Sequence, residues 1–209
     1  RDYEKQVYDW LIAKHEIDEN FTFSLRQKGS KGSELDYFIG TEKSNYFGLT
    51  FWSIPVGYPG SASDLIDVFF EQKEDGFKFF FEFGQTMSPT DDQNISALNL
   101  IRNIKENIRA LGEITYETTE DLKMFKYALG SPKSRYSTLN DLFSDLEKTL
   151  NSIIPIVENG IIDEKKSNPN FHANLISTEQ FKEIHQKLEN RLLKYKHIAD
   201  YENDTTIPF

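Results

Sequence analysis

Apolar residues recur along this chain with two different periods, and each change of period marks a change of predicted element. In the first segment Tyr3, Val7 and Leu11 fall on one helical face, which predicts a helix from Tyr3 to Lys14. Further on, apolar and β-prone residues alternate with polar ones or form short runs between turn signals, as strands do. The predicted strands are residues 21–25, 35–39, 46–56, 65–72, 77–83 and 113–118.

The strongest local signal is a β-hairpin. Leu65 to Gln72 is rich in β-forming residues, and Glu74-Asp75-Gly76 has the composition of a tight turn. Phe77 to Phe83 returns as the antiparallel partner. Because side chains alternate along a strand, the return strand has one aromatic face and one mixed face. The aromatic face comprises Phe77, Phe79, Phe81 and Phe83, and the mixed face comprises Lys78, Phe80 and Glu82.

Helical spacing returns in the second half of the chain. An apolar stripe from Ile95 to Leu111 predicts a helix, and the preceding Asp91 and Asp92 suit the positive end of its dipole. Another helix begins after Thr138, an N-cap candidate, and Pro155 should end or kink it. The segment 122–129 fits either a helix or a strand, and we favour the helix.

Three regions follow from this pattern. Residues 1–158 are expected to form one α+β domain, a mixed or antiparallel sheet of five or six strands flanked by helices. Residues 159–177 contain Gly, Lys, Asn and Pro and are predicted to be a linker. Residues 178–209 are predicted to be a helical appendage, with a long charged helix from Glu179 to about Tyr201. We expect its tail to lead into a further domain.

Composition sets limits on the class of protein. Hydrophobic residues make up 38% of the 209 residues and Phe occurs 17 times, which is unlike a disordered chain. No apolar run approaches the roughly 20 residues that span a bilayer, so no membrane partner is expected. The chain has no cysteine, which excludes disulfides and thiolate metal sites and fits a cytoplasmic location.

The net charge of −10 argues against a protein that coats nucleic acid without specificity. Two local stretches are nevertheless basic, and a charge run of this kind is more often a solvated face than a binding site. The candidate phosphate-binding cations are Arg26, Lys28 and Lys31 in the first stretch and Lys123, Lys126, Lys133 and Arg135 in the second.

Little in the sequence indicates catalysis. The four histidines lack metal-ligand spacing, and no phosphate-binding glycine loop occurs, so we expect no catalytic residue, metal or cofactor. One alternative stays open. Metal-dependent nucleases place an acid before an acid-x-Lys triplet, and Asp64 and Asp67 precede Glu71 and Lys73. The same residues also fit the polar end of a hairpin.

An aromatic cluster gives the positive indication. Tyr46, Trp52 and Tyr58 crowd beside a Gly-Tyr-Pro-Gly turn, and aromatic rings can stack on bases or enclose a flipped base. If 46–56 is one strand, Trp52 shares a face of mixed polarity with Tyr46, while Phe47 and Phe51 point into the core. Trp52 is therefore open to two interpretations, a core residue or the wall of a base pocket.

The order of these features resembles the N-terminal DNA-recognition domain of the McrB family, the GTPase subunit of modification-dependent McrBC restriction systems. The resemblance covers roughly residues 35–157. It rests on the run YFGLTFWSIPV, the hairpin DLIDVFFEQKEDGFKFFFEFGQT, and a late helix after Tyr136. It implies a domain that takes a modified cytosine into an aromatic pocket, with Trp52 as the pocket tryptophan. It also implies a downstream AAA+ motor domain and a nuclease subunit as partners.

We therefore expect a non-catalytic specificity module of a restriction or antiphage defence protein that binds double-stranded DNA. In this hypothesis Trp52, Tyr46 and Tyr58 meet a base while the basic stretches meet phosphates. The acidic surface and the long C-terminal helix favour an alternative, a protein-interaction or oligomerisation module. A magnesium-dependent nuclease is the lesser alternative.

Overall fold

The computed structural model describes residues 2–25, 46–53, 66–86, 92–118, 124–183 and 185–186. Its helices are α1 (Asp2–Ile17), α2 (Asp92–Arg109) and α3 (Leu139–Ser167), and residues 178–183 are also helical. Its strands are β1 (Ser24–Leu25), β2 (Tyr46–Thr50), β3 (Trp52–Ser53), β4 (Ile66–Lys73), β5 (Gly76–Thr86), β6 (Ile114–Glu117), β7 (Met124–Gly130) and β8 (Asn174–Leu175).

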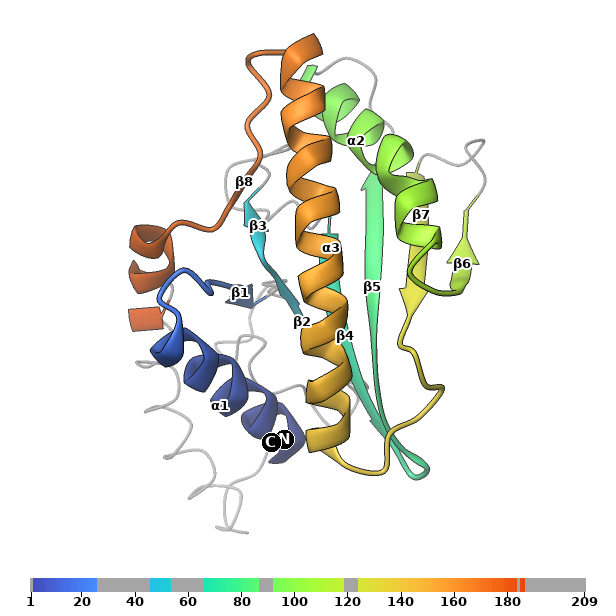
Figure 1. The fold of residues 1–209 in the computed structure, drawn as a ribbon, viewed down its shortest axis with the longest axis vertical. Helices are drawn as coiled ribbons and strands as arrows, with labels where there is room; N and C mark the ends of the chain where they lie inside the picture. Colours follow the sequence, from blue (N-terminus) through green and yellow to red (C-terminus); the bar gives the residue numbers. More distant parts are fainter. Residues whose placement is uncertain are drawn as a thin grey trace, which may run out of the picture.

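The fold is α+β, as predicted. Among the described residues, six strands form an antiparallel sheet in the order β1-β2-β4-β5-β7-β6, and β3 pairs separately with β8. Helices α2 and α3 lie side by side across one face of the sheet, and α1 lies beside the lower part of α3 (Figure 1). We call the face under α2 and α3 the near face and the opposite one the far face.

The predicted hairpin is confirmed. Strands β4 and β5 pair with Phe70 opposite Phe79 and Val68 opposite Phe81, and Gly76 closes the turn with φ +121°. The side chains of Phe79, Phe81 and Phe83 are fully buried on the near face, because α2 and α3 seal them from water. This burial is the main apolar contribution of the sheet to the core.

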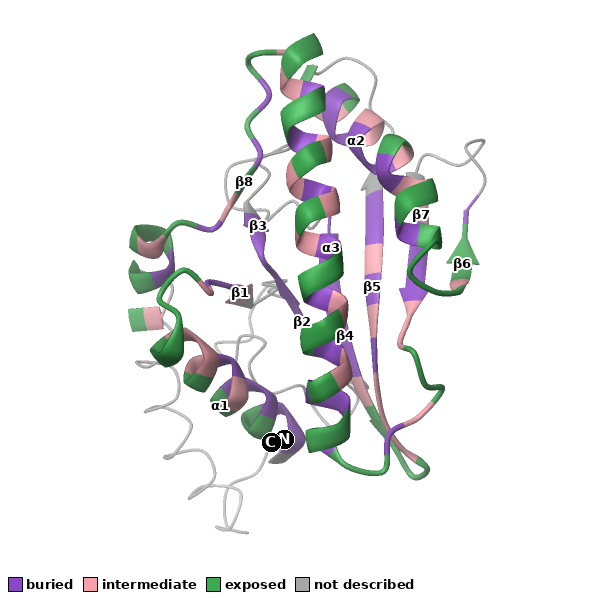
Figure 2. Cartoon of the chain, in the orientation of Figure 1, coloured by how far each residue is buried: buried purple, intermediate pink, exposed green. Residues whose placement is uncertain are grey.

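Helices α2 and α3 approach each other closely at Gly160. A Cβ placed on Gly160 would lie 2.5 Å from Ile104 Cγ2 and 2.7 Å from Leu100 Cδ1, so only glycine fits without a shift. On α2 the buried residues Ala97, Leu100, Ile101, Ile104 and Ile108 form the inner stripe. Figure 2 shows the same division along both helices, with buried positions toward the sheet and exposed positions outward.

Helix α3 corrects one prediction and confirms another. Pro155 does not end the helix, since α3 continues to Ser167. Pro155 and Asn151 are both exposed, so the Asn151 carbonyl that Pro155 cannot bond can face water, while Ile153 and Val157 keep the helix docked. The predicted N-cap is confirmed, because the Thr138 side chain accepts from the Asp141 N–H.

The segment 159–177 is not the linker that its composition predicted. Residues 159–167 complete α3, with Ile161 buried against the core. Phe171, Ala173 and Ile176 are buried too, and β8 pairs with β3. Polar residues outnumber apolar ones in this segment, but its few buried apolar side chains determine where it packs.

The helical prediction for residues 122–129 is wrong over the part that the structure describes. Residues 124–130 form β7, which pairs with both β5 and β6. Phe125, Tyr127 and Leu129 alternate into the core, and Tyr127 donates its hydroxyl to the Ile101 carbonyl at 2.7 Å. Two-sided strand pairing thus prevails over the local helical preference.

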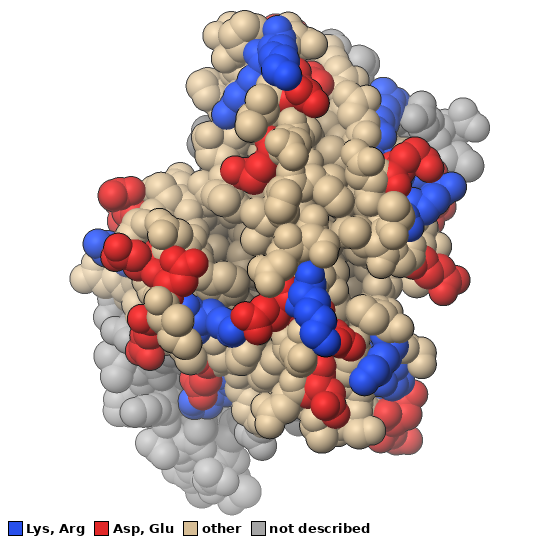
Figure 3. All heavy atoms as spheres, viewed as in Figure 1, with Lys and Arg blue, Asp and Glu red and all other residues tan. Residues whose placement is uncertain are grey.

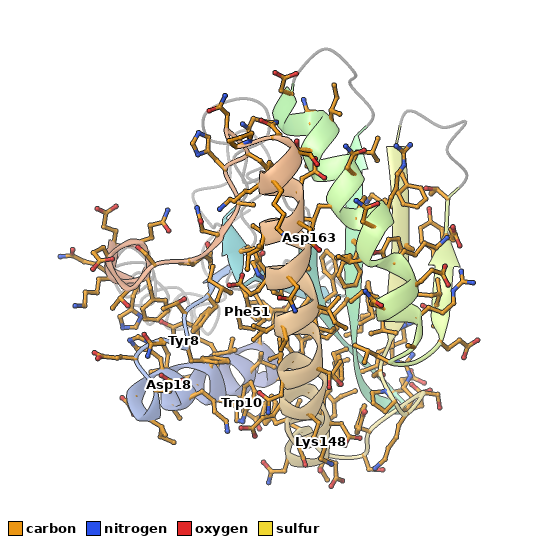
Figure 4. All side chains as sticks on the ribbon, turned by 45° about the horizontal axis from the view of Figure 1, so that its top comes forward. Tyr8, Trp10, Asp18, Phe51, Lys148 and Asp163 are labelled. Carbon is orange, nitrogen blue, oxygen red and sulfur yellow. The ribbon has the colours of Figure 1, made fainter. Side chains whose placement is uncertain are left out.

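The N-terminal helix packs through aromatic rings. Trp10 of α1 stacks on Phe143 of α3, with ring centroids 4.8 Å apart. Figure 4 shows Trp10 directed toward α3 and Phe51 in the interior of the molecule. Phe181 packs against Phe23 and His15, which brings the helical residues 178–183 onto this cluster. The predicted strand 35–39 and residues 187–209 lie outside the described residues.

Candidate functional site

The far face of the sheet carries charged and aromatic side chains together. It is built by the residues of β4, β5 and β7 that alternate with the core residues, so the strand period alone places them on one surface. Its described members are Asp67, Phe69, Glu71, Lys73, Lys78, Phe80, Glu82 and Lys126. This is the mixed face that the sequence predicted for the hairpin, extended by one strand on β7.

Opposite charges alternate across the far face. Lys126 Nζ of β7 lies 2.8 Å from Glu82 Oε1 of β5, and Lys78 Nζ lies 3.0 Å from Glu71 Oε2 of β4. Lys73 approaches the same Glu71 oxygen at 3.7 Å. Gly84 leaves room for this arrangement, because a Cβ there would lie 2.6 Å from Lys126 Cγ. Each lysine of this face is thus held by a carboxylate rather than directed freely at solvent.

Two aromatic rings lie among these charges. Phe69 and Phe80 are cross-strand partners and stack with centroids 5.2 Å apart and planes at 27°. Phe80 is half-buried, and Lys78 Nζ lies 5.6 Å from its ring centroid. Phe69 is buried, so only the partly exposed ring of Phe80 could meet a base, with Lys78 beside it to meet a phosphate.

The hairpin tip extends this surface. The backbones of Phe77 and Tyr136 exchange hydrogen bonds of 2.9 and 2.8 Å, which ties the turn to the loop before α3. That loop carries Lys133 and Arg135. Lys133 Nζ lies 5.4 Å from the centre of the Tyr136 ring, and Arg135 Nε lies 3.1 Å from Asp75 at the turn. The structure therefore brings two of the predicted cations to the hairpin tip.

Tyr136 anchors the loop that precedes α3. Its hydroxyl donates to Asp145 Oδ2 at 3.1 Å, and its side chain is buried. Burial raises the pKa of Tyr136 to about 12, helped by the negative charge of Asp145 and opposed by a hydrogen bond from the Lys133 N–H. A hydrogen bond from Lys148 lowers the pKa of Asp145, so the carboxylate stays ionised and keeps accepting.

Trp52 does not line an open base pocket. The sheet pairing of β2 ends at Thr50, and Trp52 pairs instead with Leu175 of β8, so the predicted single strand 46–56 is interrupted. Trp52 exposes only 2% of its surface and stands edge-on to Phe51. Of its two interpretations, the core residue is the one that the structure supports.

The other predicted site residues are only partly placed. Tyr46 begins β2 opposite Glu71, but its side chain is outside the description. The remaining predicted contacts lie outside the described residues, so the structure does not test them. These are Tyr58, Arg26, Lys28, Lys31 and Lys123.

The residues of the nuclease alternative are also only partly placed. Asp64 lies outside the described residues, while Asp67 is buried and faces Glu82 across the hairpin. Glu71 and Lys73 share the far face and form an ion pair. In the described part of the chain no three His, Asp or Glu side chains gather as metal ligands do.

The surface over the helices has no single sign of charge. Figure 3 shows Lys and Arg interspersed with Asp and Glu on the face that carries α3. A polyanion would meet acids among the bases there, so the described part of this side offers no continuous basic surface. None of the helices within the described ranges has the length and apolarity needed to cross a membrane.

The sequence identified Lys126, Lys133 and Arg135, but not that Glu82 and Asp75 neutralise two of them. Strand alternation could have placed Glu82, whereas the contact between Arg135 and Asp75 joins two distant turns. Comparison of the chain with protein-family models, with curated proteins and with solved structures finds no match to any of them.

Proposed function

We propose that the chain is a DNA-binding specificity module that contacts double-stranded DNA through the far face of its sheet and the hairpin tip. The observation that carries this proposal is the grouping of Lys78 and Lys126 with the half-buried ring of Phe80 on the sheet face opposite α2 and α3. Lys78 and Lys126 would contact phosphates, and Lys133 and Arg135 would extend the contact at the tip.

The carboxylates of the far face would limit its affinity for DNA. Glu71 and Glu82 already hold the lysines, and DNA phosphates must compete with them and with the overall charge of −10. Release of counterions favours binding at low salt and weakens as salt rises. The proposal therefore implies modest affinity, steep salt dependence and little non-specific coating of DNA.

The wider role follows from the resemblance to the McrB family and shares its status as a proposal. The module would act in the cytoplasm within a modification-dependent restriction or antiphage defence protein. A GTP-hydrolysing AAA+ motor domain and a nuclease subunit would be its partners. We assign no base-binding role to Trp52, since a buried indole cannot stack on a base without opening the core.

A mobility-shift titration with methylated and unmethylated duplexes tests the proposal. Lys78→Gln and Lys126→Gln should each weaken binding and lower the slope of log affinity against log salt by about 1. Lys166→Gln, an exposed lysine at the end of α3, is the matched control and should leave both unchanged. Absence of a shift at micromolar protein, or equal effects of all three variants, would refute DNA binding by the far face.

One observation favours a protein-interaction module instead. Within the described residues β6 pairs on one side only, with β7, and its Tyr116 is 51% exposed. A strand edge of this kind can accept a strand from another chain. Light scattering of the protein and of Tyr116→Lys would detect such an association, and a concentration-independent monomer would exclude self-association at this edge.

A further inference from the structure

The contact between Arg135 and Asp75 at the hairpin tip has features of an anion site held by an internal carboxylate. An anion site here would refine the proposed function, on which it rests. The backbone around this contact is fixed: the Phe77–Tyr136 hydrogen bonds hold the loop, and a Cβ on Gly76 would lie 2.4 Å from the Tyr136 carbonyl oxygen. The position of Arg135 relative to the turn is therefore set by backbone rather than by its own side chain.

The guanidinium of Arg135 is only partly used. Its Nε lies 3.1 Å from both oxygens of Asp75, while its Nη1 is buried and meets no acceptor in the described part of the chain. Arginine presents a planar fork of donors that matches a carboxylate or a phosphate. A buried donor without an acceptor is uncommon in folded proteins, so the described residues leave the hydrogen-bonding capacity of this guanidinium unsatisfied.

Asp75 is a replaceable partner. Its side chain is 66% exposed, whereas that of Arg135 is 22% exposed, so the carboxylate can turn into solvent while the guanidinium stays in place. An exposed ion pair of this kind contributes little stability. A phosphodiester of DNA presents two non-bridging oxygens, as a carboxylate does, so it can take the place of Asp75 at the guanidinium.

The surface around the hairpin turn has room for a phosphate group. A shallow hollow of about 440 Å³ lies at the turn and is lined, among described residues, by Lys73, Glu74 and Asp75. Lys73 adds a cation on the far-face side, and Lys133 sits on the Tyr136 ring beside Arg135. The acids of the turn keep the hollow from being strongly positive, so a bound anion must displace Asp75 rather than join it.

We propose that Arg135 binds a phosphate of the DNA backbone and that Asp75 occupies the guanidinium until the phosphate displaces it. Asp75 is then an internal competitor that lowers affinity, and Arg135 is the binding residue. A purely structural ion pair would behave differently, because loss of either partner would then have the same effect.

Opposite effects of two variants test this distinction. Arg135→Gln should weaken duplex binding about three- to tenfold, and Asp75→Asn should strengthen it about threefold at low salt. Arg109→Gln, which removes a half-exposed arginine of α2, is the matched control. Thermal unfolding of each variant shows whether the fold is retained. Weakening by both variants, or no change from either, would overturn the inference while leaving wild-type DNA binding intact.

A second measurement separates this inference from the proposed function. In an NMR titration of the full chain with inorganic phosphate, the side-chain Nε–H resonance of Arg135 should shift and that of Arg109 should not. A shift without any binding of duplex DNA would keep the anion site and reject the DNA role. If neither phosphate nor DNA perturbs Arg135, the anion site is rejected as well.

Discussion

Strand β5 presents two faces of opposite character, made by alternate residues of one short sequence. On the near face Phe79 and Phe81 are fully buried under α2 and α3. On the far face Lys78, Phe80 and Glu82 are half-buried and take part in ion pairs and ring contacts. The two-residue period thus divides the strand between a face that builds the core and a partly solvated face of ion pairs and ring contacts.

The largest expected effect is a difference in stability between neighbouring phenylalanines. Phe81→Ala should lower the free energy of unfolding by about 3–5 kcal/mol, because it opens a cavity in the core. Phe80→Ala should cost about 1–2 kcal/mol, since its ring is half-buried and loses mainly the stack on Phe69. Urea unfolding measures both. Equal losses would show that the far face is as much a part of the core as the near face.

Substitution of Gly76 tests the close contact between the hairpin turn and the loop before α3. Gly76→Ala should destabilise the protein by about 1–3 kcal/mol, because φ is +121° and the added carbon would collide with the Tyr136 carbonyl. Gly112→Ala is a suitable control, since its added carbon would lie 3.4 Å from Leu129 Cδ1. Thermal unfolding compares the two. An unchanged transition for Gly76→Ala would contradict the clamp between the turn and the loop.

Replacement of Tyr136 tests how far the hairpin tip is buried, through its effect on the pH dependence of stability. Its folded pKa of about 12 is above the ordinary 10.0, so its contribution to stability is complete below pH 10 and is lost as the pH rises through about 12. Tyr136→Phe should remove this part of the alkaline loss. It should also lower stability at neutral pH by about 1 kcal/mol, because the bond to Asp145 is absent. Denaturant unfolding across pH checks both effects.

Burial also raises the pKa of Tyr127, so some alkaline loss should persist in Tyr136→Phe. A titration of tyrosinate absorbance provides the independent measurement. If Tyr136→Phe removes a tyrosine that ionises near the ordinary value, the loop does not enclose the ring in solution.

The smallest expected effect concerns the ion pairs of the far face. A double-mutant cycle on Lys126 and Glu82 should give a coupling of about 0.2–1 kcal/mol, because both side chains are partly solvated. A coupling of several kcal/mol would mean that this pair stabilises the fold much as the near-face core does. It would then be a poor candidate for opening toward DNA.

Local patterns predicted those elements whose partners are near in sequence. The hairpin, helix α2 and the Thr138 cap were all predicted correctly, because turn chemistry, periodicity and capping act within a few residues. Strand β7 was missed, since Phe125 and Tyr127 become strand residues only through pairing with β5 and β6. Local preference cannot report such distant partners.

Trp52 shows the same limit for the candidate site. Strict alternation from Tyr46 would place Trp52 on the mixed face, but the chain leaves the sheet at Phe51 and pairs with β8. The partner strand lies far along the chain, in a segment whose composition indicated a linker. The cations Lys126, Lys133 and Arg135 were identified from the sequence, whereas the carboxylates that hold Lys126 and Arg135 required the fold.

The close approach of α2 and α3 at Gly160 has a consequence for how this protein can vary. A larger residue at position 160 would push α3 away from α2 unless the side chains of Ile104 and Leu100 shifted. Position 160 therefore fixes the spacing of an entire layer, although it contributes no side chain to it.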